Sequence, residues 1–204
     1  MLASGSPYRA QVLRDAGYRV EVDPPEVDER ALDEMLHTDG PDALAEHLAR
    51  LKCLDVVARH PGATVVAGDQ VGVLGAGPAR RLLSKTSDVE TAVGQLMSMG
   101  GTVHHLHSAL VVALGPDGPL VSGVDVATVT MRHFTPAQAR AYVEDFEPFD
   151  TAGSYRIEDQ EHLPASQRLV AGIDVEHRSG IMGMPLGLLE RLLAELAAVG
   201  DQRL

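Results

Sequence analysis

Cysteine, aromatic residues and long apolar runs are scarce in this chain. Cys53 is the single cysteine, aromatic residues make up 3% of the sequence, and tryptophan is absent. One cysteine cannot build an internal disulfide framework, which is typical of a reducing cytoplasm. No run approaches the roughly 20 apolar residues of a membrane span, and no charged-then-apolar leader precedes the first predicted strand. We therefore expect a soluble cytoplasmic protein with no membrane partner.

Positive charge is also in short supply, and nearly all of it is arginine. The formal net charge is −12, and Lys52 and Lys85 are the only lysines among 17 basic residues. This balance argues against a broad face for a nucleic-acid polymer, but it is compatible with a small anion held by local cations. The two lysines either remain by chance or stand where a compact ammonium is needed and a planar guanidinium would not fit.

Helical and strand patterns alternate along the chain, which predicts an α/β fold. Hydrophobic residues make up 45% of the sequence, enough for a sizeable core. Helices are predicted from residue 7 to 17 and over 30–37, 41–60, 87–100, 135–146 and 185–200, and strands over 1–3, 18–22, 63–74, 103–114, 120–132 and about 167–171. The remaining stretches, 75–86 and most of 150–184, are predicted to be irregular. We expect one domain over residues 1–204, with two lobes split near residues 75–80.

The segment LASGSPYRAQVL, at residues 2–13, joins a turn of small residues to the start of a helix. Ser6 is a good N-cap and Pro7 a good first helical residue. The backbone N–H groups of residues 4–6 at this helix start, with Arg9 one turn further on, would also suit an anion. From these residues alone, plain helix capping and phosphate binding both remain open. A capping box of Ser87 and Glu90 predicts a further helix start.

Carboxylates and histidines supply further candidates. Asp69 follows an apolar run where we expect a strand to leave the sheet, so it would bind a divalent cation, accept a proton from water, or serve as an ordinary strand-end residue. Asp28 and Glu29 would be metal ligands or a cap for the helix at 30–37. His105 and His107 would share one strand face. Since no third ligand follows at a fitting spacing, we favour a solvated face over a metal site there.

Seven stretches, taken in order, resemble the Maf family of nucleoside triphosphate pyrophosphatases. They are LASGSPYRAQVLRDAG, PEVDER, AGDQV, SKTSDVETA, RHFTPAQARAYV, FDTAGSY and GMPLGLLERLL. No single one is specific, but together they span nearly the whole chain in the family's order and spacing. The resemblance implies a Maf/ITPase-like α/β fold, in which a long mixed central sheet is flanked by helices and two lobes surround a nucleotide cleft.

The resemblance also implies a reaction in which a nucleoside triphosphate and water give a nucleoside monophosphate and pyrophosphate, with Mg²⁺ or Mn²⁺. Asp69 matches the family's catalytic carboxylate, and we expect it to orient or deprotonate the water and to share the metal with Glu29. The residues that would hold the triphosphate are Ser4, Ser6, Arg9, Lys52 and Lys85. Both of the chain's lysines thus fall on cleft positions of the family, which favours the functional explanation for them.

Three positions indicate the base. The pyrimidine branch of the family, which acts on dTTP and UTP, carries arginine, threonine and glutamine where this chain has Tyr8, Gln70 and Glu158, the residue types of the 7-methyl-GTP branch. N7-methylation gives guanine a positive ring charge, which an aromatic face and a carboxylate both favour. The alternative is that Tyr8 packs on its helix and Glu158 faces solvent.

We expect a 7-methyl-GTP pyrophosphatase. The alternatives are a dTTP/UTP pyrophosphatase and a nucleotide-binding division regulator without catalysis. The chain departs from the family pattern where Thr86 replaces a proline, residues 107–108 replace Thr-Gly, Ser179 replaces an asparagine and Met184 replaces a leucine. These departures leave the catalytic set intact and bear on the second wall of the cleft. The resemblance further implies a homodimer, which the apolar final helix would suit.

Overall fold

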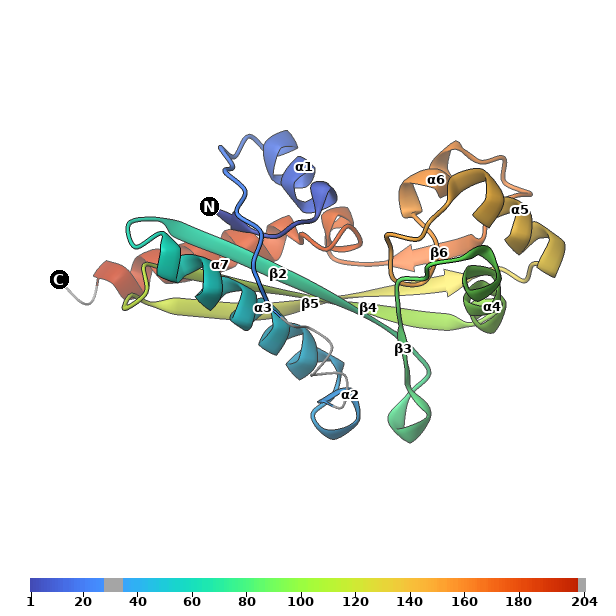
Figure 1. Ribbon diagram of the computed structural model, residues 1–204, viewed down its shortest axis with the longest axis horizontal. Helices are drawn as coiled ribbons and strands as arrows, with labels where there is room; N and C mark the ends of the chain where they lie inside the picture. The colour runs from blue at the N-terminus through green and yellow to red at the C-terminus, as the bar shows by residue number, and fades with distance from the viewer. Residues whose placement is uncertain (28–34, 202–204) are drawn as a thin grey trace. The chain divides into compact units, whose positions relative to one another are not determined.

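Three long strands carry the fold: β2 (Thr64–Leu74), β4 (Val103–Leu114) and β5 (Leu120–Met131). They belong to a computed structural model that describes residues 1–27 and 35–201 (Figure 1). With the shorter strands β1 (Leu2–Ala3), β3 (Arg81–Leu83) and β6 (Val170–Asp174), they form a six-stranded sheet in the order β1-β2-β4-β5-β6, and β3 also pairs with β2. β1 runs parallel to β2, whereas β3 and β6 run antiparallel to their partners. The predicted α/β class with a mixed sheet and flanking helices is confirmed.

The helices begin where the sequence provides caps. They are α1 (Pro7–Asp15), α2 (Met35–Thr38), α3 (Pro41–Arg59), α4 (Val89–Met99), α5 (Pro136–Phe146), α6 (Ile157–His162) and α7 (Leu186–Asp201), with short 3-10 turns at Gly77–Ala79 and Arg178–Gly180. The Ser6 side chain accepts a hydrogen bond from the backbone of Arg9, and Thr135 forms a capping box with Gln138. Both predicted helix starts are therefore confirmed.

Helix α4 begins differently from the prediction. The predicted capping box of Ser87 and Glu90 is wrong, because the N-cap is Asp88, whose carboxylate accepts the backbone N–H of Thr91 at 2.8 Å. A carboxylate next to the first helical N–H groups also interacts favourably with the helix dipole. Asp88 therefore displaces the neighbouring serine as the cap.

Three other predicted elements differ from the structure. Residues 18–22 form only an isolated bridge between Leu2 and Val22, because their partner β1 is two residues long. The predicted loop at 75–86 contains a 3-10 turn and β3, and the predicted irregular stretch at 150–184 contains α6. β6 begins at Val170, later than expected. Elements of only a few residues are too short to show a periodic pattern of hydrophobic residues in the sequence.

The chain divides into two compact units. Unit 1 comprises Met1–Gln70, His107–Val126 and Val175–Leu204, and unit 2 comprises Val71–Leu106 and Ala127–Asp174. The chain passes from one unit to the other within β2, β4 and β5, so each long strand contributes residues to both units.

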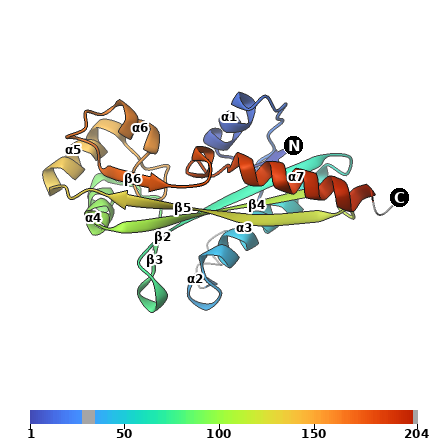
Figure 2. The same ribbon diagram turned by 180° about the vertical axis from the view of Figure 1, so that it is seen from behind.

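In unit 1, helices cover both faces of the strands, with α1 and α7 on one face and α3 on the other (Figures 1 and 2). Side chains alternate along a strand, so Leu110 and Val112 point into a core that also contains Met184 and Leu189. On β5, Ser122 points to the other face, where its hydroxyl donates to a carboxylate oxygen of Glu46 in α3. Successive residues of β2 must likewise face different helices.

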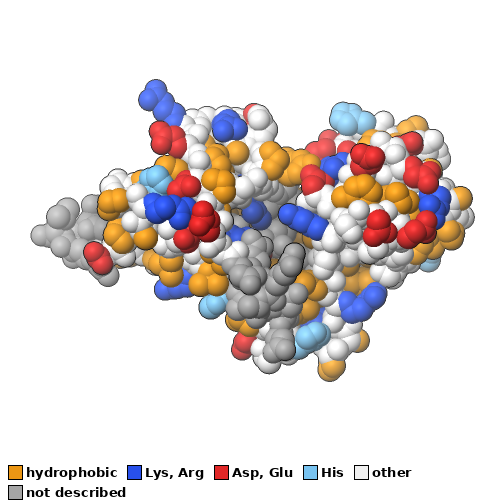
Figure 3. All heavy atoms as spheres, in the orientation of Figure 1, with side chains coloured by type: hydrophobic (Ala, Val, Ile, Leu, Met, Phe, Trp, Pro, Cys, Tyr) orange, Lys and Arg blue, Asp and Glu red, His pale blue; other side chains and the backbone are white. Residues whose placement is uncertain are grey.

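The surface mixes charges of both signs. On the face drawn in Figure 3, blue arginine and lysine side chains and red aspartate and glutamate side chains both occur. Within residues 1–27 and 35–201, no helix has the length and apolar character needed to cross a membrane.

Candidate functional site

Asp69 lies inside β2, next to the point where β1 ends. The strand predicted over 63–74 is confirmed as β2, which continues past Asp69 to Leu74, so the expectation that a strand leaves the sheet at Asp69 is wrong. The strand that ends here is β1, whose last residue, Ala3, lies opposite Ala67. Asp69 therefore follows the last residue of β2 that pairs with β1.

Lys52 is the partner of Asp69. From α3 its ammonium donates a hydrogen bond of 2.5 Å to Oδ1 of Asp69, and the two side chains are 8% and 9% exposed. Coulomb attraction offsets only part of the cost of desolvating two charges, so such a pair is weak evidence for a stabilising role. The pair of an ammonium from α3 and a carboxylate from β2 is instead a candidate for a site of chemistry.

Cys53, the neighbour of Lys52, has a different environment. Its thiol is fully buried and donates to the carbonyl of Val65 at 3.8 Å. Burial raises the pKa of the thiol to about 11, so it remains protonated and unreactive at neutral pH. This cysteine is therefore part of the core.

Ser4, Ser6 and Arg9 come together at the start of α1. Oγ of Ser4 accepts hydrogen bonds of 3.2 Å from Nη1 of Arg9 and from the backbone N–H of Ser6. Nε of Arg9 donates to the carbonyl of Gly183 at 2.9 Å. Gly183 has φ +74°, and a Cβ there would lie 3.2 Å from the guanidinium, so only glycine suits this approach. The turn thus holds Arg9 in place, and Tyr8 lies half-buried beside it.

Gln70 points to the opposite face of β2 from Asp69. Its Nε2 lies 2.8 Å from Oγ of Ser108 and 3.0 Å from the carbonyl oxygens of Gly180 and Ile181. Gly68, two residues earlier on the same face, approaches Arg9, whose Nε lies 3.5 Å from the position of a Cβ at Gly68. In unit 1 the structure therefore groups Lys52 with Asp69 on one face of β2, and Ser4, Arg9 and Gln70 on the other.

Lys85 belongs to unit 2, where it is exposed just after β3. Its two neighbours are tightly held. Gln95 of α4 accepts from the backbone N–H of Ser84 at 3.0 Å and donates to its carbonyl at 2.9 Å, and the same amide donates to Oγ of Ser154 at 2.8 Å. Thr86 also bonds Ser154, at 3.2 Å. An exposed side chain on so firmly held a backbone is well placed to meet an anion.

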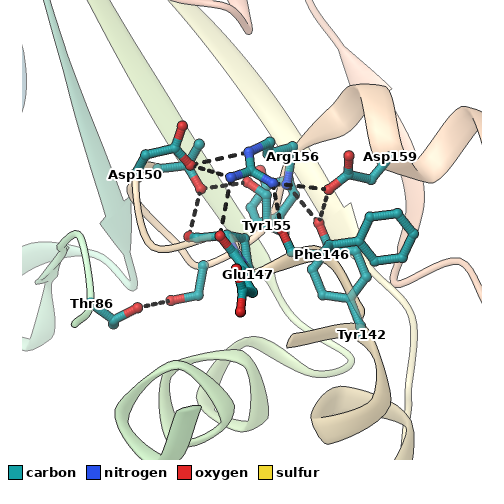
Figure 4. A network of polar contacts seen from close by, with 11 residues as sticks. Thr86, Tyr142, Phe146, Glu147, Asp150, Tyr155, Arg156 and Asp159 are labelled. Atoms are coloured by element: carbon teal, nitrogen blue, oxygen red, sulfur yellow. Dashed lines mark hydrogen bonds and ion pairs between the residues drawn. The ribbon is translucent and has the colours of Figure 1, made fainter. Parts of the chain in front are cut away.

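A second network in unit 2 fixes the segment that leads to Glu158. Figure 4 shows the guanidinium of Arg156 between Asp150 and Asp159. It donates to the carbonyls of Phe146 and Glu147 at 2.8 and 3.1 Å, and to Oδ1 of Asp150 at 2.6 Å. These bonds close the loop that joins α5 to α6.

Glu158 follows this loop as a half-buried residue in the first turn of α6. Close by in sequence, the hydroxyl of Tyr155 lies 2.8 Å from Nε2 of His104, whose other ring nitrogen, Nδ1, is buried with no partner among the described residues. Burial lowers the pKa of His104 to about 4, so the imidazole is neutral. His104, Gln95 and Ser108 were not identified from the sequence, since no pattern links residues so far apart.

Two predictions about metal ligands have different outcomes. Glu29 lies outside the described residues, so its part in a metal site stays a prediction. Across residues 1–27 and 35–201, no group of three or more histidine, cysteine, aspartate or glutamate side chains is arranged to hold a metal ion. The expected solvated face at His107 is wrong, because the ring is 13% exposed and its Nδ1 lies 2.6 Å from Asp42.

Comparison with known proteins shows the family of the chain. Residues 1–196 match the family described as Maf-like protein. The chain is 32% identical to a dTTP/UTP pyrophosphatase of Dehalococcoides mccartyi, over 96% of this chain and 81% of the relative. It is 31% identical to a 7-methyl-GTP pyrophosphatase of Syntrophotalea carbinolica, over 99% and 98%, and 35% identical to one of Mesorhizobium japonicum, over 98% and 96%. The chain belongs to the Maf-like protein family.

Proposed function

We propose that this protein is a nucleoside triphosphate pyrophosphatase that converts 7-methyl-GTP and water into 7-methyl-GMP and pyrophosphate. The observation that supports the reaction most strongly is the buried pair of Lys52 and Asp69 on β2. Relatives that match almost the full length of the chain carry the names of pyrophosphatases, which supports the same reaction class.

Asp69 acts on the attacking water. Its carboxylate is held at Oδ1 by Lys52, so the side chain has a fixed direction from which it orients or deprotonates a water aimed at the α-phosphorus. The leaving group is pyrophosphate. Arg9, Lys52 and Lys85 hold the triphosphate. Arg9 and the ammonium of Lys52 also stabilise negative charge that builds on the phosphate oxygens.

The carboxylates of the proposed site are compatible with a divalent cation. Magnesium is commonly bound by one or two carboxylates together with substrate phosphates, and Asp69 supplies one such carboxylate. Glu29 is the second ligand that we propose. When bound, the cation would supply further positive charge to the triphosphate.

The preference for 7-methyl-GTP rests on the chemistry of Tyr8, Gln70 and Glu158. An aromatic ring and a carboxylate both attract a base with a positive ring charge, which a neutral pyrimidine lacks. The competing candidate is a dTTP/UTP pyrophosphatase, a name that other relatives carry.

Pyrophosphate release from 7-methyl-GTP, GTP, dTTP and UTP, with and without Mg²⁺, tests the proposal. We expect 7-methyl-GTP to give the highest kcat/KM, and Glu158→Gln to lower that value about fivefold to tenfold while leaving UTP nearly unchanged. Glu161→Gln, on the same helix, is the matched control. Fastest release from dTTP and UTP would replace the proposed substrate with the competing one, and no release from any triphosphate would favour a binding protein without catalysis.

A further inference from the structure

A hydroxyl and an amide in unit 1 fix each other's hydrogen atoms. Ser108 on β4 is 1% exposed, and its Oγ lies 2.9 Å from the carbonyl oxygen of Gly180. A carbonyl oxygen only accepts, so the single hydroxyl proton of Ser108 must point at Gly180. The bond of 2.8 Å between Ser108 and Nε2 of Gln70 therefore has the amide as its donor.

The Gln70 amide has only one acceptable orientation. Besides Ser108, the carbonyl oxygens of Gly180 and Ile181 each lie 3.0 Å from Nε2. Turning the amide over would place Oε1 against two carbonyl oxygens and a hydroxyl whose proton is already engaged. The buried acceptors would then lack donors. The free-energy cost of leaving them unpaired exceeds what one hydrogen bond contributes to stability. Nε2 thus faces the protein, and Oε1 points away from these three acceptors.

The acceptors themselves have little freedom to move. The backbone N–H of Gly183 donates to the carbonyl of Gly180 at 3.1 Å, and that of Gly180 donates to the carbonyl of His177 at 2.9 Å. On its other side Gly180 packs directly against the buried carboxyl of Asp125, with which any Cβ would collide. The turn at 177–183 therefore presents its carbonyl oxygens at fixed positions.

We propose that Ser108 is a positioning residue for Gln70: it holds the amide so that Oε1, an acceptor, is the atom offered to a ligand. A base that binds against Gln70 must then present an N–H donor. This inference rests on the proposed function, because it takes Gln70 as a residue that contacts the base. The orientation of the amide can nevertheless be tested without any substrate.

Gln70→Glu tests the orientation through stability. The glutamate replaces the inward donor with an oxygen, and only its protonated form supplies a hydrogen to the three acceptors. We expect the Tm of Gln70→Glu to lie near that of the parent at pH 5 and to fall about 5 °C or more below it at pH 8. The control is Gln138→Glu, the same change at an exposed helix N-terminus. Equal behaviour of the two variants at both pH values would overturn the proposal.

Ser108→Ala tests the positioning through substrate choice. Without the hydroxyl, the amide loses one of its acceptors and the ratio of kcat/KM for 7-methyl-GTP to that for UTP shifts about threefold to tenfold, whichever base the parent prefers. The control is Ser122→Ala, which also removes a hydroxyl bonded across unit 1 but lies on the other face of the strands. A ratio that moves no more in Ser108→Ala than in Ser122→Ala contradicts the role of Ser108.

Failure of the proposed function would look different. If the parent hydrolyses none of these triphosphates, the readout becomes the exchange of the Gln70 side-chain amide protons with solvent, followed by NMR and assigned by their loss in Gln70→Glu. Faster exchange in Ser108→Ala than in Ser122→Ala would then support the positioning role of Ser108, although the absence of hydrolysis contradicts the proposed reaction. Unchanged exchange would overturn both.

Discussion

The two units treat charge in opposite ways. Unit 1 buries a full ion pair, in which the ammonium of Lys52 donates to Oδ1 of Asp69. In unit 2 the side chain of Arg156 is 20% exposed, and its guanidinium donates to the backbone carbonyls of Phe146 and Glu147 and to Asp150. The only buried histidine side chain among the described residues, His104 of unit 2, is held neutral.

This difference separates two uses of a cation. A guanidinium that donates to several backbone carbonyls fixes a loop, as Arg156 does in unit 2. An ammonium buried against one carboxylate contributes little to stability for its cost. We therefore propose that the lysine serves the chemistry of Asp69, and exchanging the two residue types tests this difference.

The largest effect is expected from Lys52→Arg. The charge is kept, but a planar fork cannot occupy the place of an ammonium 2.5 Å from Oδ1 of Asp69. We expect kcat/KM for the best substrate to fall about 100-fold or more. Lys85→Arg, the same change at the exposed lysine, should cost far less. Similar losses at the two positions would show that the buried pair has no special role.

Acid should destabilise unit 2 through His104. Its pKa in the folded protein is about 4, below the ordinary 6.5, so between these values the unfolded chain binds more protons. The contribution to stability is complete above pH 6.5 and is lost as the pH falls toward 4, by about 2 kcal/mol between pH 7 and pH 5.

Urea unfolding at the two pH values measures this loss. Glutamine does not titrate in this pH range, so His104→Gln should reduce the difference in unfolding free energy between the two pH values. His162→Gln, at an exposed site, should leave that difference unchanged. If His104→Gln lost as much stability on acidification as the parent, the buried imidazole would not be the cause.

Arg156→Lys probes the loop of unit 2. A lysine cannot reach the carbonyls of Phe146 and Glu147 together with Asp150, so we expect a loss of about 1–2 kcal/mol in the free energy of unfolding. Arg140→Lys, where the arginine binds only exposed carboxylates, should change less. A larger loss at Arg140 would contradict the idea that backbone carbonyls make the difference.

The smallest effect is expected at Gln95. Gln95→Ala frees Ser84 and Ser154 and lets the backbone on both sides of Lys85 move. We expect KM for the triphosphate to rise about twofold to fivefold with little change in kcat. A cation that contacts only the substrate's phosphates stabilises the bound substrate and the transition state equally. Gln138→Ala is the control. A fall in kcat without a change in KM would instead place Lys85 in the transition state.

The sequence predicts the parts of the fold that local chemistry determines. Ser6 and Thr135, each followed by a proline, mark helix starts because an N-cap and the first helical residue are neighbours in the sequence. The strand expected at 18–22 fails because its pairing depends on β1, which is too short to continue it. The short helix α6 is likewise stabilised from a distance, since the amide oxygen of Gln160 accepts the backbone N–H groups of Leu169 and Val170.

The site follows the same division. Lys52 and Asp69 were both identified by residue type and resemblance, but only the structure shows that they form one buried pair. Gln70 was predicted to contact the base, whereas Ser108 was noted only as a departure from the family pattern. Its role depends on a carbonyl 72 residues away, and no local pattern encodes such a bond.

The catalytic role of Asp69 is the central claim, and Asp69→Asn tests it most directly. The asparagine keeps the shape of the side chain and can still accept a hydrogen bond from Lys52, but it cannot take a proton from water. We predict that pyrophosphate release from 7-methyl-GTP in the presence of Mg²⁺ falls at least about 100-fold, while circular dichroism shows a folded protein. Release near the parent rate from a folded Asp69→Asn protein would contradict the account.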